Sequence, residues 1–335
     1  MIILAALLIV CVAVFDKGEE KKREKSFYNE YFDTVVTVAD YSGRSKRKFE
    51  ENCASVEKTL EYYHKLFDIY NDHSGVTGLY EINKNAGIAP IKVPSELIEF
   101  LEFSKEMYTL SGGEVNIAMG AVLSIWHDLR EGAIADPENA RIPTEEELSE
   151  AAKHCDIEKL IIDKKSSTVY LADKDMSLDV GAIGKGYAAE RAAELLYERG
   201  AEGYVLNLGG NIRVIGEKPD GEGFKTGIKD PLLSEDYAKI VTIKDTSAVT
   251  SGGYERYFSV GDRRYHHIID KDTLFPAEYF ASVTVITEDS GLADALSTAL
   301  FCMSYEEGAA LVKGLAEVRV IWVYHDGRII DSSEK

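Results

Sequence analysis

The sequence predicts an α+β fold with mixed sheets flanked by helices. Long amphipathic helical patterns occupy residues 45–67 and 95–110, whereas short apolar and β-branched segments dominate from residue 212 onward. Neither a repeat of solenoid period nor a low-complexity linker divides the 335 residues. A chain of this length can bury a large core, and we expect one big domain or two intimately packed halves.

Composition and charge narrow the classes of function. Hydrophobic residues make up 45% of the chain and charged residues 29%, as in globular proteins. The formal charge of −20 opposes a polyanionic partner. We therefore expect no nucleic acid, and a small nucleotide would need a metal ion or local basic groups. The four cysteines include no CxxC pair, which argues against a cysteine zinc site and a disulfide framework.

The first 25 residues differ from the rest. Residues 1–15 are wholly apolar and a charged run follows at 16–25, which indicates an export or membrane-anchoring segment and a solvated tether. As a helix the apolar part would be about 22 Å long, short of the roughly 30 Å hydrocarbon core. Residues 8–11 end in Val10-Cys11 and resemble a bacterial lipoprotein cleavage box, although Val10 stands where a small residue is usual.

We therefore divide the chain into an anchor and tether (1–25) and a folded domain (26–335). The expected location is the extracytoplasmic face of a bacterial cytoplasmic membrane. Lipidation of Cys11 and a misassigned start site both stay open, and a buried N-terminal strand or helix is the less favoured alternative.

The first part of the folded domain is mainly helical by its pattern. A β-branched strand at 32–38 precedes the charged amphipathic helix at 45–67. The stretch 68–87 is loop-like and could line a pocket. The next helix begins near Ser95 and ends at Gly112-Gly113.

Two further helices and a hairpin complete this region. Residues 114–120 lead into a helix that carries Leu123, Trp126 and Leu129. Thr144 and Glu147 form a capping box, so a helix should run to about residue 154. The segments 160–162 and 169–171 flank a polar turn and read as a hairpin.

The stretch 177–211 organises the chain. It reads as a strand (177–180), a glycine turn, a helix ended by Gly200, a strand (204–206) and a second glycine turn. Asp179 and Lys185 beside the first turn make a nucleotide cleft as plausible as an ordinary βαβ unit. The spacing Gly181, Gly184, Lys185 is not that of a P-loop, and the dinucleotide motif GxGxxG is absent from the sequence.

Beyond residue 211 the pattern is mostly of strands. They are expected at 212–215, 224–229, 239–244, 256–260 paired with 264–269, and 283–286. A polar glycine turn is expected at 250–253, and helices at 290–303 and shortly after it. The strand 318–324 turns at Asp326-Gly327 into 328–330, because Asp-Gly is a strong hairpin signal.

Asp294 and Thr298 are the first candidates for chemistry. They stand four residues apart on a helix and therefore share one face. A carboxylate beside a hydroxyl suits Mg²⁺. Alone the pair is weak evidence, because such an Asp often favours the helix dipole and a helical Thr often bonds back to a carbonyl.

His266 and His267 are the second candidates. On an alternating strand they point to opposite faces, so one could enter a cleft as a general base while the other stays at the surface. Two satisfied histidines near a turn would be the more ordinary interpretation.

Six motifs together are more specific than any one of them. FDTVVTV, SLDVGAIGKGYAAE, NLGGN, AVTSGGYERYF, HHIID and DALSTALF occur in the order and approximate spacing of the ApbE family. The resemblance covers nearly everything from Tyr31 to the C-terminus. It implies an ApbE-like α+β fold with largely antiparallel sheets and an FAD cleft between two packed halves. It also implies an exported, Mg²⁺-dependent FAD:protein FMN transferase.

Such an enzyme splits FAD, releases AMP and attaches FMN through its phosphate to a Thr or Ser hydroxyl of an acceptor flavoprotein, for example a subunit of a membrane redox pump. By the same resemblance, His267 is the residue that deprotonates the acceptor hydroxyl. The metal would be held by Asp294, Thr298 and the carbonyl of Ala182. The flavin-nucleotide contacts would be Phe32, Tyr70, Glu114, Val115, Asn116, Asp179, Lys185 and Ile268.

Two departures from the family pattern stand out. The family usually has Pro, Arg, Thr, Gly where this chain has Lys271 to Leu274, which puts the shape of the turn beside His267 in question. Asn116 replaces a commoner aspartate.

Two other functions stay open. An FAD pyrophosphatase would give water the place of the acceptor. The resemblance implies that an aromatic such as Tyr70 suits transfer, whereas a small polar residue suits hydrolysis. A non-catalytic, flavin-binding surface lipoprotein would leave Asp294, Thr298 and His267 without a purpose. The acceptor and the oligomeric state do not follow from the sequence.

Overall fold

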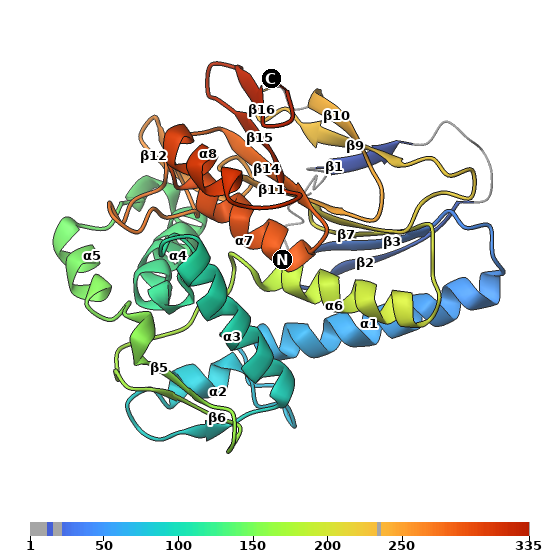
Figure 1. Ribbon diagram of the computed structural model, residues 1–335. Helices are drawn as coiled ribbons and strands as arrows, with labels where there is room; N and C mark the ends of the chain where they lie inside the picture. The colour runs from blue at the N-terminus through green and yellow to red at the C-terminus, as the bar shows by residue number, and fades with distance from the viewer. Residues whose placement is uncertain (1–11, 16–21, 233–235, 335) are drawn as a thin grey trace.

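The structure is a computed structural model that describes residues 12–15, 22–232 and 236–334. Its centre is an eight-stranded sheet, and every pairing within it is antiparallel (Figure 1). The strand order is β16 (Ile329–Asp331), β15 (Arg319–Val323), β14 (Ser282–Thr287), β11 (Ser247–Gly252), β8 (Asn211–Ile215), β7 (Tyr204–Leu208), β3 (Thr34–Asp40) and β2 (Arg23–Tyr31). The predicted α+β fold with largely antiparallel sheets flanked by helices is confirmed.

Three layers form the larger part of the molecule. Helices α1 (Lys46–Phe67), α6 (Gly184–Glu198) and α7 (Ser290–Phe301) lie on one face of the sheet. A small sheet of β1 (Val12–Phe15), β9 (Phe224–Lys229) and β10 (Tyr237–Ile243) lies on the other face. Successive side chains of β7 point to opposite faces of the central sheet, so that Leu206 packs toward the helices and Val205 toward the small sheet.

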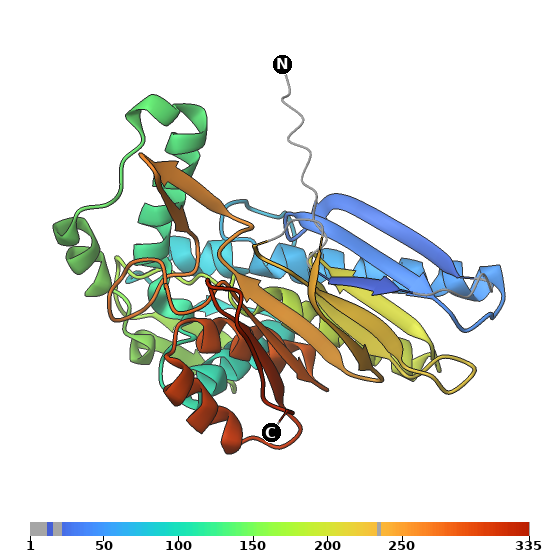
Figure 2. The same ribbon diagram turned by 90° about the horizontal axis from the view of Figure 1, so that it is seen from above.

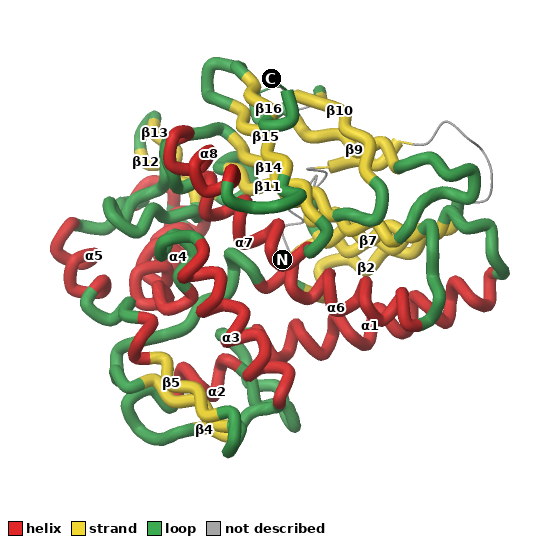
Figure 3. The backbone as a smooth tube through the Cα atoms, in the orientation of Figure 1, coloured by secondary structure: helices red, strands yellow, loops and turns green. Residues whose placement is uncertain are grey.

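The remaining elements gather at one end of the sheet, as Figures 2 and 3 show. There Trp126 on α4 stacks on Tyr265 with ring centroids 6.0 Å apart, which joins α4 to the β12–β13 hairpin. The elements of this end are α2 (Leu79–Lys84), α3 (Ser95–Leu110), α4 (Gly120–Ala135), α5 (Glu145–Ala152), α8 (Tyr305–Lys313), β4 (Ile91–Lys92), β5 (Leu160–Asp163), β6 (Thr168–Leu171), β12 (Tyr257–Val260), β13 (Arg263–His266) and the short 3₁₀ turns Ile117–Met119, Pro137–Asn139 and Ile157–Lys159.

The predicted strand at 177–180 is wrong. These residues form a buried loop without a ladder partner, and β7 pairs antiparallel with β3 and β8, so the βαβ interpretation fails as well. The Asn83 amide takes the place of a ladder, because its Oδ1 accepts from the Leu178 N–H at 2.7 Å and its Nδ2 donates to the Leu178 carbonyl at 3.0 Å. The alternation of apolar and polar residues at 177–180 reflects which side chains are buried, although the segment does not pair with a strand.

Three other expectations are corrected. Phe32 and Asp33 are not strand residues, since both have positive φ (56° and 51°) and make the turn between β2 and β3. The expected polar glycine turn at 250–253 belongs largely to β11, a strand between β14 and β8. The stretch 68–87 contains α2. Residues such as Ser251 and Gly252 are typical of turns, so the sequence did not predict β11. This strand is stabilised by its pairing with neighbouring strands.

The N-terminal segment is partly described. Val12–Phe15 form β1, which pairs with β9, and β2 begins at Arg23 inside the predicted charged tether. Residues 1–11, with the predicted cleavage box and Cys11, and residues 16–21 lie outside the described residues. Within the described ranges, none of the helices combines the length and apolar character needed to cross a membrane.

A buried ion pair ties the helical layer to the sheet. Glu190 on α6 accepts two hydrogen bonds from Arg213 on β8, from Nε at 2.9 Å and from the guanidinium NH2 at 3.1 Å. Its Oε2 also accepts from the backbone N–H of Ser290, the first residue of α7, at 2.8 Å. One carboxylate therefore fixes α6, α7 and β8 relative to one another, and its buried charge is matched by a fork-shaped donor.

Gly186 allows the two helices to touch. A Cβ placed on Gly186 would lie 2.3 Å from the Ser290 carbonyl oxygen and 2.4 Å from the Asp294 Cβ. Both distances are far below van der Waals contact, so no larger residue fits without moving α7.

We predict that Gly186→Ala lowers the free energy of unfolding by about 1–3 kcal/mol, because α6 and α7 must separate. The matched control is Gly132→Ala in the exposed face of α4, where a Cβ would meet nothing within 4 Å. Since alanine favours a helix over glycine, this control should gain about 0.5–1 kcal/mol. Urea denaturation of both variants measures the difference, and equal effects would contradict the proposed helix contact.

Candidate active site

The contact between α6 and α7 brings three oxygen donors together. The Oδ2 atom of Asp294 accepts a hydrogen bond from the Gly186 N–H at 2.7 Å. Thr298 lies one turn further along α7, and its Oγ1 is 3.4 Å from the carbonyl oxygen of Ala182. The predicted carboxylate, hydroxyl and carbonyl therefore lie along one side of α7, against the start of α6.

Asp294 is buried, with 4% of its surface exposed. Burial raises the pKa of its carboxyl, whereas the charge of Lys185, the Gly186 hydrogen bond and the Asn211 amide lower it. Within the described ranges no lysine or arginine forms an ion pair with it. A buried carboxylate in this setting gains from a cation, and a carboxylate, a hydroxyl and a carbonyl are the hard donors that fit Mg²⁺.

Asp179 closes the glycine turn before α6. Its Oδ1 accepts from the Gly181 N–H at 2.9 Å, and its own N–H donates to the Ile117 carbonyl at 2.8 Å. Burial raises the pKa of Asp179, while the Gly181 hydrogen bond and the nearby charge of Arg256 lower it. The carboxylate is thus held by backbone and lies close to positive groups.

Lys185 stands in the first turn of α6, directly before Gly186, whose N–H binds Asp294. The charge of Lys185 lowers the pKa values of both Asp294 and His267. In the described part of the chain it has no ion-pair partner of its own. A free ammonium in this turn is suited to binding an anion.

His267 follows directly after β13 and is oriented by one backbone carbonyl. The Arg256 carbonyl oxygen accepts from the His267 N–H at 3.2 Å and contacts its Nδ1 at 3.2 Å. A carbonyl can only accept, so Nδ1 carries the proton and Nε2 keeps its lone pair. Although the ring reaches solvent, surrounding protein lowers its pKa, as do the charges of Arg256 and Lys185. The imidazole is therefore neutral at neutral pH.

His266 has a structural role. Its Nε2 donates to the Ala277 carbonyl at 2.8 Å, and its Nδ1 accepts from the Ile268 N–H at 3.2 Å. The two histidines do diverge, as predicted, but the second does not stay at the surface: His266 is half-buried against Phe301, with ring centroids 5.5 Å apart. Both of its nitrogens are satisfied, which leaves His267 as the available base.

Phe32 lies in the β2–β3 turn. Its N–H donates to Nδ1 of His64 at 3.4 Å, and its ring meets the His64 ring edge-on at 5.6 Å. The guanidinium of Arg256 reaches the carbonyl of Asp33 at 3.4 Å. The same arginine thus joins this strained turn to His267, and strained turns of this kind concentrate at functional sites.

Tyr70 presents an exposed aromatic ring, with 57% of its surface accessible. The ring stacks on His127 at 5.1 Å, and its hydroxyl lies 3.4 Å from His127 Nδ1. The protein around Tyr70 and the charge of Asp179 raise its pKa to about 12. Tyr70, Asp179 and Arg256 therefore surround the same region, and the tyrosine ring offers it a flat apolar surface.

The predicted contact segment 114–116 makes several hydrogen bonds and an ion pair within the protein. Glu114 lies 3.3 Å from the Lys271 ammonium, and burial raises the pKa of its carboxyl. The Val115 N–H donates to Ser111 Oγ at 3.0 Å. Asn116 caps the 3₁₀ turn, because its Oδ1 accepts from the Ala118 N–H at 2.9 Å.

The side chains of Val115 and Ile268 are buried in the core, and the Asn116 amide also donates to the Cys155 carbonyl at 2.9 Å. A flavin contact by these residues stays a prediction.

The unusual turn after His267 is well formed. Asp270 Oδ1 accepts from the N–H groups of Asp272 and Thr273, each at 2.8 Å. Leu274 has φ of +61°, the left-handed conformation, at the position where the family usually has glycine. Its carbonyl accepts from Trp126 Nε1 at 3.0 Å. The turn keeps its shape because hydrogen bonds compensate for the unfavourable backbone of a leucine.

Two residues of this site had no role assigned from the sequence. Ser251 on β11 contacts Thr298 Oγ1 at 3.2 Å and Ser297 Oγ at 2.9 Å. Arg256 orients His267 as described above. Both lie in the motif AVTSGGYERYF, so the motif indicated the place, but the contacts join segments that are far apart in sequence.

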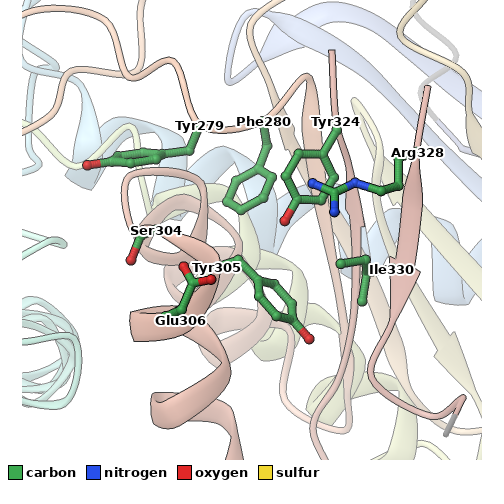
Figure 4. A pocket seen from close by; sticks show the side chains of 8 residues that line it. All are labelled: Tyr279, Phe280, Ser304, Tyr305, Glu306, Tyr324, Arg328 and Ile330. Atoms are coloured by element: carbon green, nitrogen blue, oxygen red, sulfur yellow. The ribbon is translucent and has the colours of Figure 1, made fainter. Parts of the chain in front are cut away.

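A pocket of about 450 Å³ lies elsewhere, between the start of α8 and strands β15 and β16 (Figure 4). Tyr324 and Arg328 form one wall, with the guanidinium 3.8 Å from the ring centroid. None of the predicted site residues lines it.

Comparison with known proteins agrees with this fold. A sequence model of the ApbE family matches residues 32–322. The FAD:protein FMN transferase of Treponema pallidum (strain Nichols) is 32% identical over 336 residues, covering 96% of this chain and 90% of that protein. The FAD:protein FMN transferase of Klebsiella pneumoniae (strain 342) is 30% identical over 286 residues, 85% of each chain. The crystal structure of the ApbE protein from Thermotoga maritima superposes with a TM-score of 0.81 at 29% identity, covering 93% of this chain and 97% of that one.

The two curated relatives, each at least 30% identical to this chain over most of its length, place it in the transferase class. The chain belongs to the ApbE family.

We predict that His267 stays neutral well below the range in which an unperturbed histidine titrates, which is near pH 6.5. The unfolded chain takes up this proton as pH falls through about 6.5, whereas the folded state does not. The free energy of unfolding should therefore decrease below about pH 6.5. Histidine ¹H–¹³C NMR titration, assigned with His267→Asn, measures the pKa. A normal titration step near 6.5 for this ring would refute the arrangement.

Proposed function

We propose that this chain is a Mg²⁺-dependent FAD:protein FMN transferase, which attaches FMN through its phosphate to a Thr or Ser hydroxyl of an acceptor flavoprotein and releases AMP. The observation that carries the proposal is the α6–α7 contact, which brings the Asp294 carboxylate and the Thr298 hydroxyl to the turn that holds Ala182 and Lys185. The Lys185 ammonium would attract an anionic diphosphate bound at this metal site, and its charge also lowers the pKa of His267.

The residues would divide the work as follows. Asp294, Thr298 and the Ala182 carbonyl would hold Mg²⁺, which when bound supplies charge neutralisation at the diphosphate. Lys185 would bind the same phosphates, and the exposed ring of Tyr70 would offer a stacking surface to the flavin.

The chemical step would exchange one P–O bond for another. The acceptor hydroxyl oxygen bonds to the FMN-side phosphorus, the bond to the AMP oxygen breaks, and the hydroxyl proton moves to Nε2 of His267. Nδ1 cannot take that proton because it already donates to the Arg256 carbonyl.

FAD pyrophosphatase activity is the second candidate. It would use the same phosphate site with water as nucleophile. The exposed ring of Tyr70, stacked on His127, favours transfer because it covers the region with an apolar surface. Mass spectrometry of a candidate acceptor after incubation with FAD and Mg²⁺ separates the two, since hydrolysis leaves the acceptor unmodified.

We also propose that the protein acts on the extracytoplasmic face of a bacterial cytoplasmic membrane, anchored through the apolar residues 1–11. Residues 12–15 of the predicted anchor instead form β1, which pairs with β9 in the folded part of the chain. Fractionation of native cells tests the location, and a protein found free in the cytoplasm with Met1 retained would contradict it.

We predict that Asp294→Asn abolishes Mg²⁺-dependent FAD turnover, because the site loses its only charged metal ligand. The variant should be at least as stable as the wild type in EDTA, since burial already disfavours the ionised carboxyl. Added Mg²⁺ should raise the unfolding midpoint of the wild type but not of the variant. Thr298→Val should weaken the Mg²⁺ response less, because water can replace a neutral ligand.

Asp289→Asn is the matched control. Asp289 caps the same helix, its Oδ1 accepting from the Leu292 N–H at 2.7 Å, and asparagine caps equally well. It should keep both turnover and the Mg²⁺ response. A wild-type response in Asp294→Asn would remove the basis of the metal site.

We predict that His267→Ala retains FAD binding and loses FMN attachment by about 10²–10⁴-fold, the contribution of a positioned base. Its unfolding midpoint should change little, because only Nδ1 is bonded. His266→Ala should instead lower stability, because it leaves the Ala277 carbonyl and the Ile268 N–H without their partner. In-gel flavin fluorescence of the acceptor and FAD titration give the two readouts. An inactive but stable His266→Ala beside an active His267→Ala would reverse the assignment.

A further inference from the structure

A second group of metal-binding side chains lies at the C-terminal end of α1. His64 stands in the last turn of α1, Asp68 follows the helix as its C-cap, and His73 lies in the loop toward α2. One ligand atom from each of the three lies within 4.8 Å of the other two. None of them belongs to the Asp294 group, and the proposed reaction gives none of them a role.

We propose that His64, Asp68 and His73 bind a transition-metal ion of borderline softness, and that Zn²⁺ fits them best. Two imidazoles and one carboxylate are typical Zn²⁺ ligands, with water completing the coordination. The Asp294 group, by contrast, has only hard oxygen donors. The chain therefore carries two metal sites of different preference.

The Asp68 carboxylate is oriented in advance. Its Oδ1 accepts from the N–H groups of Tyr70 at 2.8 Å and Asn71 at 3.1 Å. Its Oδ2 is thereby turned to His73, whose Nε2 lies 2.8 Å away. Hydrogen bonds of this kind orient the carboxylates that bind metal ions. They favour binding because the Asp68 side chain loses less conformational freedom when the ion binds.

The site is accessible and its surroundings favour a cation. The His73 side chain is 24% exposed and that of Asp68 is 7% exposed, so an ion can enter from solvent yet is partly shielded. The one nearby ammonium on α1, Lys65, is paired with Glu61. The overall charge of −20 adds a general attraction for cations.

Ligation by His64 would affect the Phe32 turn. A neutral imidazole has a single ring lone pair, and in His64 that lone pair accepts from the Phe32 N–H at 3.4 Å. This hydrogen bond is at the upper limit of length, so a metal can displace it at small cost. Metal binding must then release the Phe32 amide, and this gives the site a signature that does not depend on catalysis.

The test uses the full chain, Zn²⁺ as the probe and excess Mg²⁺ to occupy the Asp294 group. Bound zinc is measured by mass spectrometry after gel filtration, and the unfolding midpoint is followed in parallel. The wild type and Asp294→Asn should each retain a single Zn²⁺ and be stabilised by it. His73→Ala and Asp68→Asn should weaken binding by about 100-fold or more.

His154→Ala is the matched control, because His154, Asp173 and Asp175 form the other cluster of metal-binding side chains in the described residues. It should keep the zinc. A wild type without bound zinc, retention of zinc by His73→Ala, or its loss in Asp294→Asn would overturn the proposal. If a variant does not fold, the ¹⁵N NMR signal of the Phe32 amide in the wild type provides the test. Zn²⁺ should shift this signal, and an unchanged signal would contradict ligation by His64.

Discussion

The rest of the site depends on the antiparallel contact between α6 and α7. Gly186 and Glu190 are four residues apart on one helix, and Ser290 and Asp294 are four apart on the other. The two helices exchange hydrogen bonds at both levels, from Gly186 N–H to Asp294 and from Ser290 N–H to Glu190. Because Arg213 neutralises Glu190, this contact is also anchored to the sheet. The proposed metal ligands, the glycine turn and Lys185 therefore keep their places through one packing arrangement.

The charge near the candidate site differs in sign from the net charge of the whole chain. The protein carries −20 overall, yet Lys185 lies in the turn that begins α6 at the site, and Arg256 holds the neutral His267 through its carbonyl. A diphosphate substrate would thus meet a small positive region on an acidic protein. Its affinity would arise from these few groups and a bound metal, and general attraction would contribute nothing.

Sequence reasoning predicted what local patterns determine. The helix beginning after Ser45 and the capping box at Thr144 appear as expected, because caps and 3.6-residue periodicity are local. The common face of Asp294 and Thr298 on α7 was predicted for the same reason, since residues four apart on a helix lie on one side. By contrast, β11 was missed, because its small polar residues form a strand only between two partners contributed by distant segments. Ser251 and the orientation of His267 by Arg256 depend on such distant pairings, which no local pattern encodes.

The α6–α7 contact also has a consequence for how the protein folds. Gly186 and Asp294 are 108 residues apart in the chain, and Glu190 and Ser290 are 100 apart. Closing loops of this length is slow, and a growing chain lacks α7 until most of it has been made. A nascent or truncated chain can therefore form α1 and α6 while it still lacks Asp294, the carboxylate of the proposed Mg²⁺ site. Competence for chemistry would appear late and in a single step, after the last long-range contact has formed.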